Sequence, residues 1–467
     1  MKVCVLLPDY STSAVDYQNY DPPRNLAALL PNDEVDTIFL NKLTTYKQLK
    51  SVSKKGYDIF VNLCEGYLEW EVPSIDVIYT LELLNLPYTG PTTLLYDPPK
   101  ELMKYVAYCE NVQTPAYTLL NANDDVAKAI QPLRFPLFVK PAKAGDSLGI
   151  DENSLVNNIN ELQNKINAII KEYDELLIEE YIEGREFTVL VIANEDLKTS
   201  TALQPVEFIF PAGKKFKTYA LKTSELHTDA NIPVADKNLS NTLKDAAQRI
   251  FKSFYGVGYA RLDFRMNANG ELFFLEINFT CSVFYSDGYE GSADYILKYD
   301  GIGQQNFLQH IIKEGIARHA ALQKKYIVKG NSIAGYGIYA TKNIAEGEVI
   351  FKGEERAQHL VTKTFVENNW GEVDKENFAR YAYPISNDVF ILWSKNPAEW
   401  APQNHSCNAN TGYQGLDVIA LKNIQKNEEL TLDYGNFLDE NAQPFTCKCG
   451  SPNCRTTISG KKGNRIK

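Results

Sequence analysis

The 467-residue sequence predicts an α/β region followed by a smaller, mostly-β region. Up to about residue 325, apolar runs that suit strands alternate with runs of helical periodicity. From Tyr326 onward the pattern changes to short strands and turns, and three of the eight cysteines cluster near the end. Because one hydrophobic core rarely serves a chain of this length, we expect roughly two to four structural units.

The composition is that of a globular protein with no general affinity for nucleic acid or anionic membranes. Hydrophobic residues make up 44% of the chain, and the net charge is −11 at pH 7. The exception is a short basic tail with Lys461, Lys462, Arg465 and Lys467. No apolar run approaches the length of a membrane span, and the first residues predict a strand rather than a signal peptide. We therefore expect a cytoplasmic protein with no nucleic-acid or membrane partner.

The elements expected in the first region form a βα arrangement with a parallel sheet. They are strands at residues 3–7 and 59–63 and helices at residues 75–84, 100–109 and 306–325. A strand within residues 134–149 carries Lys140 and runs into a loop with Gly145 and Gly149. Such a loop can bring backbone N–H groups and a lysine to phosphate oxygens, although many surface turns also combine glycine with lysine.

A hinge-like turn follows a second strand. Residues 176–182 predict this strand, which leads through Glu183 and Gly184 to a third strand at residues 186–191. Acidic groups at both ends of such a turn suit hydrogen bonds to an adenine amine and to ribose hydroxyls. The alternative is a pair of exposed glutamates at strand ends.

Residues 259–278 predict a hairpin that carries an acidic pair. Asn269-Gly270 favours a two-residue type I′ turn. If Ala268 pairs with Glu271, Asp263 lies opposite Glu276 and Arg261 opposite Asn278 on one face. The other face is expected to be the core face, with Leu262, Phe264, Met266, Phe273, Leu275 and Ile277. Opposed carboxylates repel unless a cation lies between them, so the hairpin indicates a hard-metal site; the alternative is a solvated face with an accidental acid pair.

Four stretches, residues 57–90, 135–149, 176–189 and 258–278, occur in the order and approximate spacing of the ATP-grasp ligases. They resemble most closely the D-alanine:D-alanine ligase branch, over about residues 1–320. The resemblance implies a three-part ATP-grasp fold, with an N-terminal domain at residues 1–96 and the central and C-terminal domains at residues 97–325.

This resemblance also implies a set of site residues. Those for ATP are Lys100 and Lys140 at the phosphates, Glu179 at the adenine amine with the hinge at Ile182, Glu186 at the ribose, and Lys222 over the terminal phosphate. Asp263, Glu276 and Asn278 would bind two Mg²⁺, and Arg261 would stabilise an oxyanion. The implied reaction is attack of a carboxylate on the γ-phosphate of ATP, followed by attack of an amine on the acylphosphate to form an amide or peptide bond.

The departures from that family concern the substrate. Cys281 and its neighbours stand where those ligases have a Pro-Gly turn, Asp146 lies within their glycine loop, and Thr223 replaces a loop tyrosine. Residues 10–23 lack the acidic motif for the substrate amine at its usual place. We therefore expect a different small-molecule amino acid, peptide or related acid as substrate. Asp146 either pairs with a substrate ammonium or stabilises a turn as an Asx cap.

The clustered cysteines of the second region predict a metal site. Cys447, Cys449 and Cys454 have the spacing C-x-C-x4-C, which can converge on one tetrahedral Zn²⁺. A structural zinc site needs four ligands, and Cys407 is the natural fourth. The alternative is a set of reduced surface thiols.

The second region resembles the SET-domain methyltransferases with a post-SET zinc segment, over about residues 327–460. The motifs are Gly335-Tyr336-Gly337, Asn404-His405-Ser406-Cys407 followed by Asn410, residues 429–435 (ELTLDYG), and the cysteine tail. The resemblance implies a SET domain at residues 326–446, and a zinc segment with the basic tail at residues 447–467.

The implied residues of this second site are Gly335, Tyr336, Gly337, Asn404 and His405 for S-adenosylmethionine, Tyr434 beside the acceptor amine, and Cys407, Cys447, Cys449 and Cys454 for Zn²⁺. The alternative interpretation of Tyr434 is a buried core tyrosine, and that of His405 is a capping histidine. Tyr381 and Tyr383 are candidates for further aromatics of the acceptor channel.

Together these motifs predict a bifunctional enzyme, an ATP-dependent carboxylate–amine ligase fused to a methyltransferase that acts on an amine, most simply lysine. The methyl acceptor is either a lysine of a protein or peptide or a small molecule. The alternative is a SET protein-lysine methyltransferase whose ligase-like part is a non-catalytic binding or dimerising scaffold. A homodimer is expected only by analogy with the ligase family.

Overall fold

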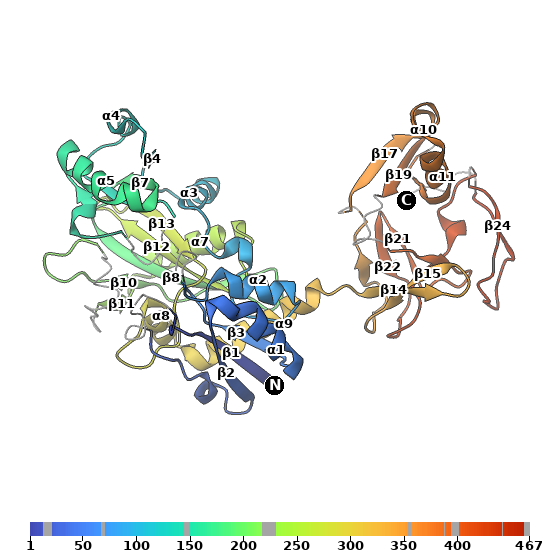
Figure 1. Cartoon of the computed structure of the whole chain (residues 1–467), viewed down its shortest axis with the longest axis horizontal. Helices are drawn as coiled ribbons and strands as arrows, with labels where there is room; N and C mark the ends of the chain where they lie inside the picture. The colour runs from blue at the N-terminus through green and yellow to red at the C-terminus, as the bar shows by residue number, and fades with distance from the viewer. Residues whose placement is uncertain are drawn as a thin grey trace. The chain divides into compact units, whose positions relative to one another are not determined.

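In the computed structural model, the apolar runs at the start of the chain form a parallel sheet (Figure 1). β1 (Lys2–Pro8) pairs with β2 (Glu34–Leu40) on one side and with β3 (Ile59–Asn62) on the other, all parallel as predicted. Helices α1 (Thr45–Val52) and α2 (Ile75–Leu83) contribute Leu49, Val77 and Ile78 to the core on one face. In such a sheet the carboxyl ends of the strands border the ligand crevice.

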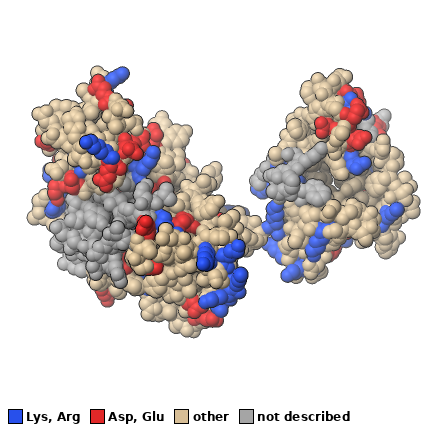
Figure 2. Space-filling view, in the orientation of Figure 1, with Lys and Arg blue, Asp and Glu red and all other residues tan. Residues whose placement is uncertain are grey.

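The chain divides into a first unit of residues 1–321 and a second unit of residues 322–467. The structure describes residues 1–12, 21–66, 71–143, 149–216, 230–353, 356–386, 388–393, 401–440 and 442–461. Lys222, Thr223, Gly145 and Asp146 lie outside these ranges, as does most of the basic tail. Within them, no helix is both long and apolar enough to cross a membrane. Figure 2 shows basic and acidic side chains interspersed with wider uncharged areas on each unit.

A four-stranded antiparallel sheet in the first unit carries the predicted hinge strand. Its order is β4 (Tyr117–Asn121), β7 (Glu175–Glu180), β5 (Leu137–Pro141) and β6 (Leu155–Val156). Helices α4 (Val126–Ala129) and α5 (Ile159–Tyr173) share its core, to which α5 contributes Leu162, Ile166 and Ile169. These positions recur every three to four residues, which is the periodicity of one helix face.

A six-stranded sheet forms the centre of the first unit. Its strands are β11 (Asn231–Pro233), β10 (Val206–Phe208), β8 (Arg185–Ala193), β12 (Tyr259–Met266) and β13 (Leu272–Asn278), with β9 (Ser200–Ala202) beside β8. β8 is buried on both faces. Phe187, Val189 and Val191 join the core with α3 (Lys100–Cys109) and α7 (Lys237–Ser253). Leu190 and Ile192 join the core with β1, β3, α8 (Ser292–Asp300) and α9 (Gly303–Leu322).

The β12–β13 hairpin has the predicted pairing but not the predicted turn. Asp263 lies opposite Glu276 and Arg261 opposite Asn278. The turn is longer than the expected type I′ turn: the Asn267 N–H donates to the Glu271 carbonyl at 3.1 Å. Only Gly270 of the intervening residues has a positive φ, +80°. This is a three-residue loop with glycine in the left-handed position.

A β-bulge compensates for the longer turn. Phe264 pairs with Phe274 but Asp263 pairs with Glu276, so Leu275 has no partner of its own in β12. One extra residue in the turn and one in the strand cancel, which restores the predicted acid pair. The predicted core face was wrong in part, because Phe274 is buried while Phe273 and Leu275 are only half-buried.

The second unit is built from short strands. β14 (Tyr326–Asn331) pairs with β15 (Gly335–Ala340), and a five-stranded sheet has the order β16 (Val349–Phe351), β22 (Asp417–Ala420), β21 (Thr411–Gln414), β23 (Thr431–Leu432) and β20 (Asn404–His405). A third sheet contains β17 (Gln358–Thr362), β19 (Val389–Trp393) and β18 (Tyr383–Pro384), with α10 (Lys363–Asn369) and α11 (Glu372–Tyr381) following β17. β24 (Phe445–Thr446) and β25 (Thr457–Ile458) form the last pair.

Candidate functional site

Glu179 is the centre of a buried charge cluster in the first unit. It lies on β7, directly between Tyr117 of β4 and Phe138 of β5. Its Oε1 is 2.5 Å from Lys140 Nζ and its Oε2 is 2.8 Å from Lys104 Nζ. Burial by itself raises the pKa of Glu179, but the two ammonium groups outweigh burial and hold this pKa at about 2. The carboxylate is therefore ionised at neutral pH.

Lys104 is a site residue that the sequence prediction missed. It lies one helical turn after Lys100 on α3, so both side chains share the helix face toward the sheet. Burial lowers the pKa of Lys100, and the charge of Glu276 partly offsets this effect. The four-residue spacing of the two lysines on a predicted helix was the available signal.

Glu186 and Ile182 are joined by a second residue that the prediction missed. Arg265, buried on β12, donates to Glu186 Oε2 at 3.0 Å and to the Ile182 carbonyl at 2.8 Å. It also donates to the Lys215 carbonyl at 2.5 Å, and its guanidinium lies 4.8 Å from the centre of the Tyr181 ring. Arg265 therefore fixes the strand end and the hinge that were predicted to border a nucleotide.

One of the hairpin acids, Glu276, lies within electrostatic range of Lys100 and Lys140. Asp263 Oδ1 accepts hydrogen bonds from Thr188 at 2.5 Å and from Arg261 Nε at 3.2 Å. Asn278 Nδ2 lies 3.5 Å from Glu276 Oε1. Burial opposes the charged form of Arg261, but Asp263 raises its pKa above the ordinary value. The side-chain oxygens of Asp263, Glu276 and Asn278 are the kind of ligand that Mg²⁺ prefers. The three lysines suit phosphate oxygens, so the residues present fit Mg²⁺ and ATP.

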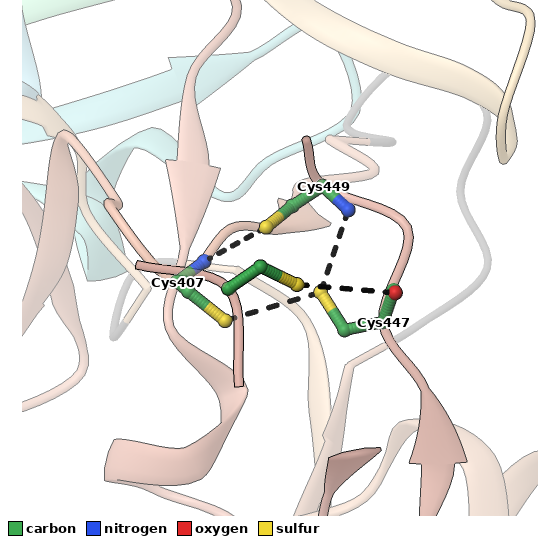
Figure 3. Close-up of side chains that lie close together, drawn as sticks. Cys407, Cys447 and Cys449 are labelled. Atoms are coloured by element: carbon green, nitrogen blue, oxygen red, sulfur yellow. Dashed lines mark hydrogen bonds between the residues drawn. The ribbon is translucent and has the colours of Figure 1, made fainter. Parts of the chain in front are cut away.

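In the second unit, the four predicted cysteines converge (Figure 3). Their sulfur atoms all lie within 4.8 Å of one another, and Cys407 Sγ is 3.9 Å from Cys447 Sγ. Zn–S bonds of about 2.3 Å in a tetrahedron separate the sulfurs by about 3.8 Å, so the cluster fits Zn²⁺. Burial opposes ionisation, but backbone N–H groups of Cys407 and Ser451 help to lower the pKa of Cys449 to about 6. The ionised thiolate is the form that binds zinc.

His405 connects this cluster with Tyr434. Its Nδ1 accepts the Tyr434 backbone N–H at 3.1 Å, so the ring proton is on Nε2, which lies 3.4 Å from Cys407 Sγ. Both ring nitrogens are thus engaged within the protein. The contact depends on the parallel pairing of β20 with β23, which aligns His405 with Leu432.

Asn404 and Gly337 meet at Glu429, which the sequence prediction missed as a site residue. Glu429 Oε1 accepts from Asn404 at 2.7 Å and from Asn331 at 2.9 Å. Asn404 also donates to the Tyr336 carbonyl at 3.0 Å. A Cβ at Gly337 would lie 2.4 Å from Glu429 Oε1, so only glycine allows this approach. Gly335 and the Tyr336 side chain are exposed next to it.

Tyr434 belongs to a group of aromatic residues. Its hydroxyl donates to the Gln403 carbonyl at 2.5 Å, and burial raises its pKa to about 12, so the hydroxyl stays protonated. The group also contains Tyr383, Trp393, Tyr413, Phe437 and Phe445, with ring centres 4.7 to 6.5 Å apart between neighbours. Tyr381 is exposed, whereas Tyr383 is buried in this group.

The comparisons with known proteins agree with both units. A family model described as the D-ala D-ala ligase C-terminus matches residues 107–284, and a model of the SET domain matches residues 335–435. The chain joins a D-alanine–D-alanine ligase-like region to a SET domain.

Relatives of the ligase-like region include the D-alanine–D-alanine ligases of Aquifex aeolicus and Halothermothrix orenii. Each is 30% identical, over 42% of this chain, and the matches span 64% and 58% of the two proteins, so less than two thirds of their length. Solved ligases from Coxiella burnetii and Bacillus anthracis cover 69% of this chain and 97% and 100% of their own, each with a TM-score of 0.50. Their identities of 19% and 21% show the fold alone. The predicted ATP-grasp fold is confirmed by these neighbours, and the SET domain by its family model.

Proposed function

We propose that the ligase-like region is an ATP-dependent carboxylate–amine ligase that works through an acylphosphate. The proposal rests on two groups of charged residues that lie in one site. One group consists of Lys100, Lys104 and Lys140, and the other is the acid pair of Asp263 and Glu276. Lysines and bound Mg²⁺ neutralise the charge that develops during phosphoryl transfer. The acid being activated is a small amino acid, peptide or related carboxylate.

The residues have distinct tasks in this proposal. Lys100 and Lys140 bind the phosphates, and Glu179 keeps Lys140 and Lys104 in position. Asp263, Glu276 and Asn278 would hold Mg²⁺, which would supply Lewis-acid stabilisation of the transferring phosphoryl group. Arg261, anchored by Asp263, stabilises the oxyanion that forms when the amine attacks.

Replacement of Glu276 by glutamine tests this activity. We expect Mg-ATP-dependent phosphate release, measured against a panel of amino acids, to fall by about 100-fold or more, because an electrostatic group facing developing charge is lost. Glu271→Gln is the matched control, since this acid lies on the same hairpin but is exposed at the turn. Unchanged phosphate release in Glu276→Gln would refute the ligase proposal.

We also propose that the SET domain transfers a methyl group from S-adenosylmethionine to an amine, with lysine as the simplest acceptor. Support comes from the aromatic group around Tyr434, which can desolvate an amine and so favour its neutral, nucleophilic form. Asn404 with Gly335, Tyr336 and Gly337 would bind the cofactor, which supplies the methyl group. His405 positions Tyr434 through its Nδ1.

Tyr434→Phe tests the methyl transfer. Removal of the hydroxyl is expected to lower the rate about tenfold or more, because a hydrogen bond beside the reacting atoms is lost. Methyl incorporation into the proteins and small molecules of a cell extract measures this rate, and mass spectrometry of the products identifies the acceptor. Phe365→Leu on α10 is the control, because Phe365 is exposed and is not part of the aromatic group. Intact methylation in Tyr434→Phe would contradict the assignment.

One observation favours the alternative of a non-catalytic ligase-like scaffold. Glu179 and Glu186, the two acids predicted to hold the nucleoside, are already paired with lysines and with Arg265. Equilibrium binding of Mg-ATP, followed by a phosphate-release assay, decides between the two functions. A ligase requires Mg-ATP binding and phosphate release that depends on the carboxylate substrate, whereas a scaffold that has lost the nucleotide site shows neither.

A further inference from the structure

Residues 209–216, which we call the strap, contact both of the sheets that supply the proposed nucleotide site. Lys140 lies on β5 of the four-stranded sheet, and Glu186 lies on β8 of the six-stranded sheet. The strap follows β10 of the six-stranded sheet and reverses direction in a turn, where the Lys214 N–H donates to the Pro211 carbonyl at 3.0 Å. Its contacts with the two sheets come from the residues on either side of this turn.

Two aromatic residues of the strap pack on different sheets. The Phe210 ring centre lies 5.5 Å from the guanidinium of Arg265 on β12. Phe216 is buried and meets Phe138 of β5 edge to face, with ring centres 5.0 Å apart. Phe138 precedes Lys140 by two residues on the same strand. The strap is therefore a bridge from the strand of Arg265 to the strand that carries a phosphate-binding lysine.

The Lys215 carbonyl fastens the strap to the hinge. It accepts from Arg265 Nη2 at 2.5 Å and from the Tyr181 hydroxyl at 2.7 Å, so both acceptor positions of this oxygen are used. The same guanidinium donates to Glu186 and to the Ile182 carbonyl. Arg265 thus contacts the predicted ribose acid, the hinge and the strap at once.

Burial decides which contacts of the strap matter most. Lys214 lies 2.6 Å from Glu152 and Lys215 lies 3.0 Å from Glu183, but these four side chains are 33% to 73% exposed. Exposed ion pairs contribute little, because water screens them. Arg265 is only 3% exposed, and loss of its hydrogen bonds would leave buried acceptors without a charged donor. The position of the strap therefore depends mainly on the contacts around Arg265.

We propose that Arg265 is a positioning residue that couples nucleoside binding to the strap. This inference rests on the ATP-dependent activity proposed above and adds a responsive element to its nucleotide site. A bound ribose removes water from Glu186 and from Arg265 beside it, and hydrogen bonds are stronger where water is excluded. The nucleoside therefore restrains the strap across both sheets. The phosphate groups contact lysines instead and leave the strap unchanged, since a ligand shifts only a conformation with which it has differential contacts.

The test compares Mg-ATP with magnesium tripolyphosphate, which has the phosphates but no nucleoside. Amide hydrogen exchange of the strap is measured on the full chain with each ligand in excess. We expect ATP, but not tripolyphosphate, to slow exchange in residues 209–216 by about tenfold, the factor for one hydrogen bond.

Arg265→Lys keeps the charge opposite Glu186, but one ammonium group cannot serve the three acceptors of the guanidinium. The slowing of exchange by ATP should therefore be lost in this variant. In calorimetry the affinity for Mg-ATP should fall by about tenfold, while the affinity for tripolyphosphate stays the same.

Two further variants complete the test. Tyr181→Phe removes one donor to the Lys215 carbonyl and leaves the pair of Arg265 and Glu186 intact, so the strap should exchange faster in the nucleotide-free chain. Arg185→Lys is the matched control, because this exposed arginine of β8 makes an ion pair outside the strap, and it should behave as the unchanged chain. Thermal unfolding verifies that each variant is folded. If Arg265→Lys is not, Tyr181→Phe decides, and unchanged exchange in it would refute the coupling.

The outcomes separate this inference from the ligase activity. Equal slowing by ATP and tripolyphosphate, or slowing by ATP that persists in Arg265→Lys, would overturn the inference. If ATP slows exchange of the strap but no acid stimulates phosphate release, the ligase proposal fails and the inference stands. If Mg-ATP does not bind, both fail.

Discussion

The Glu179 charge cluster of the ligase-like region and the cysteine cluster of the SET domain position their side chains in different ways. Glu179, Lys140 and Arg265 lie on strands of five to eight residues that pair with neighbours on both sides. His405 and the cysteines lie on or beside strands of only two residues, namely β20, β24 and β25. The first site is fixed by its sheets, whereas the second depends on contacts among its own functional groups.

This difference predicts that metal removal affects one unit only. Chelation of zinc, or Cys449→Ser, should abolish methyl transfer and expose the C-terminal segment to proteolysis, because structural zinc contributes about 10 to 16 kcal/mol to small domains. Mg-ATP binding to the ligase-like region should be retained. Metal analysis is expected to find one zinc per chain, and its loss should accompany the loss of methylation. Full methyl-transfer activity in a zinc-free chain would contradict this difference between the two units.

A second prediction concerns the ion pairs of Glu179. Lys104→Met leaves the buried Glu179 carboxylate with one lysine partner, Lys140, instead of two, which should lower the free energy of unfolding of the ligase-like region by about 1 to 3 kcal/mol. Urea unfolding measures this change. Lys128→Met, at an exposed position of α4, is the control and should change stability by less than about 0.5 kcal/mol.

The same ion pairs predict a pH dependence. The pKa of Glu179 is held at about 2, below its ordinary 4.5, so its pairs stabilise the folded chain above pH 4.5 and lose this effect as the pH falls toward 2. Lys104→Met should reduce the loss of stability over this acidic range. An identical acid profile in the variant would show that Lys104 and Glu179 are not coupled.

Much of the architecture followed from sequence pattern, but some site residues did not. The parallel sheet and the cysteine cluster were predictable because continuous apolar strands and close cysteines each have few physical explanations. Arg265 and Glu429 were not, because each acts through partners distant in sequence. Arg265 joins Glu186 to the Ile182 carbonyl, and Glu429 joins Asn331 to Asn404. A single sequence contains no signal for such long-range pairs.

A smaller effect is expected where the SET domain packs its backbone most closely. Gly337→Ala places a methyl group against Glu429 and Asn404, which should separate them at a cost of about 1 to 3 kcal/mol. The KM for S-adenosylmethionine should rise while the zinc content stays unchanged. Gly330→Ala on β14 is a matched control, since no atom lies within 4 Å of a Cβ at that position. Equal KM values for S-adenosylmethionine in Gly337→Ala and Gly330→Ala would contradict a role for Glu429 in the cofactor site.

The smallest effect is expected at the turn of the β12–β13 hairpin. Gly270→Ala forces a side chain into a backbone with φ +80°, but its Cβ would meet no atom within 4 Å, so the cost is limited to about 1 kcal/mol of strain. If the turn fixed the pairing of Asp263 with Glu276, this change would also impair phosphate release. β12, however, pairs with β8 along its whole length, and the bulge at Leu275 absorbs the extra residue of the turn. We therefore expect a slightly less stable chain with unchanged Mg-ATP turnover. A loss of turnover without unfolding would show that the turn, rather than the central sheet, positions the acids.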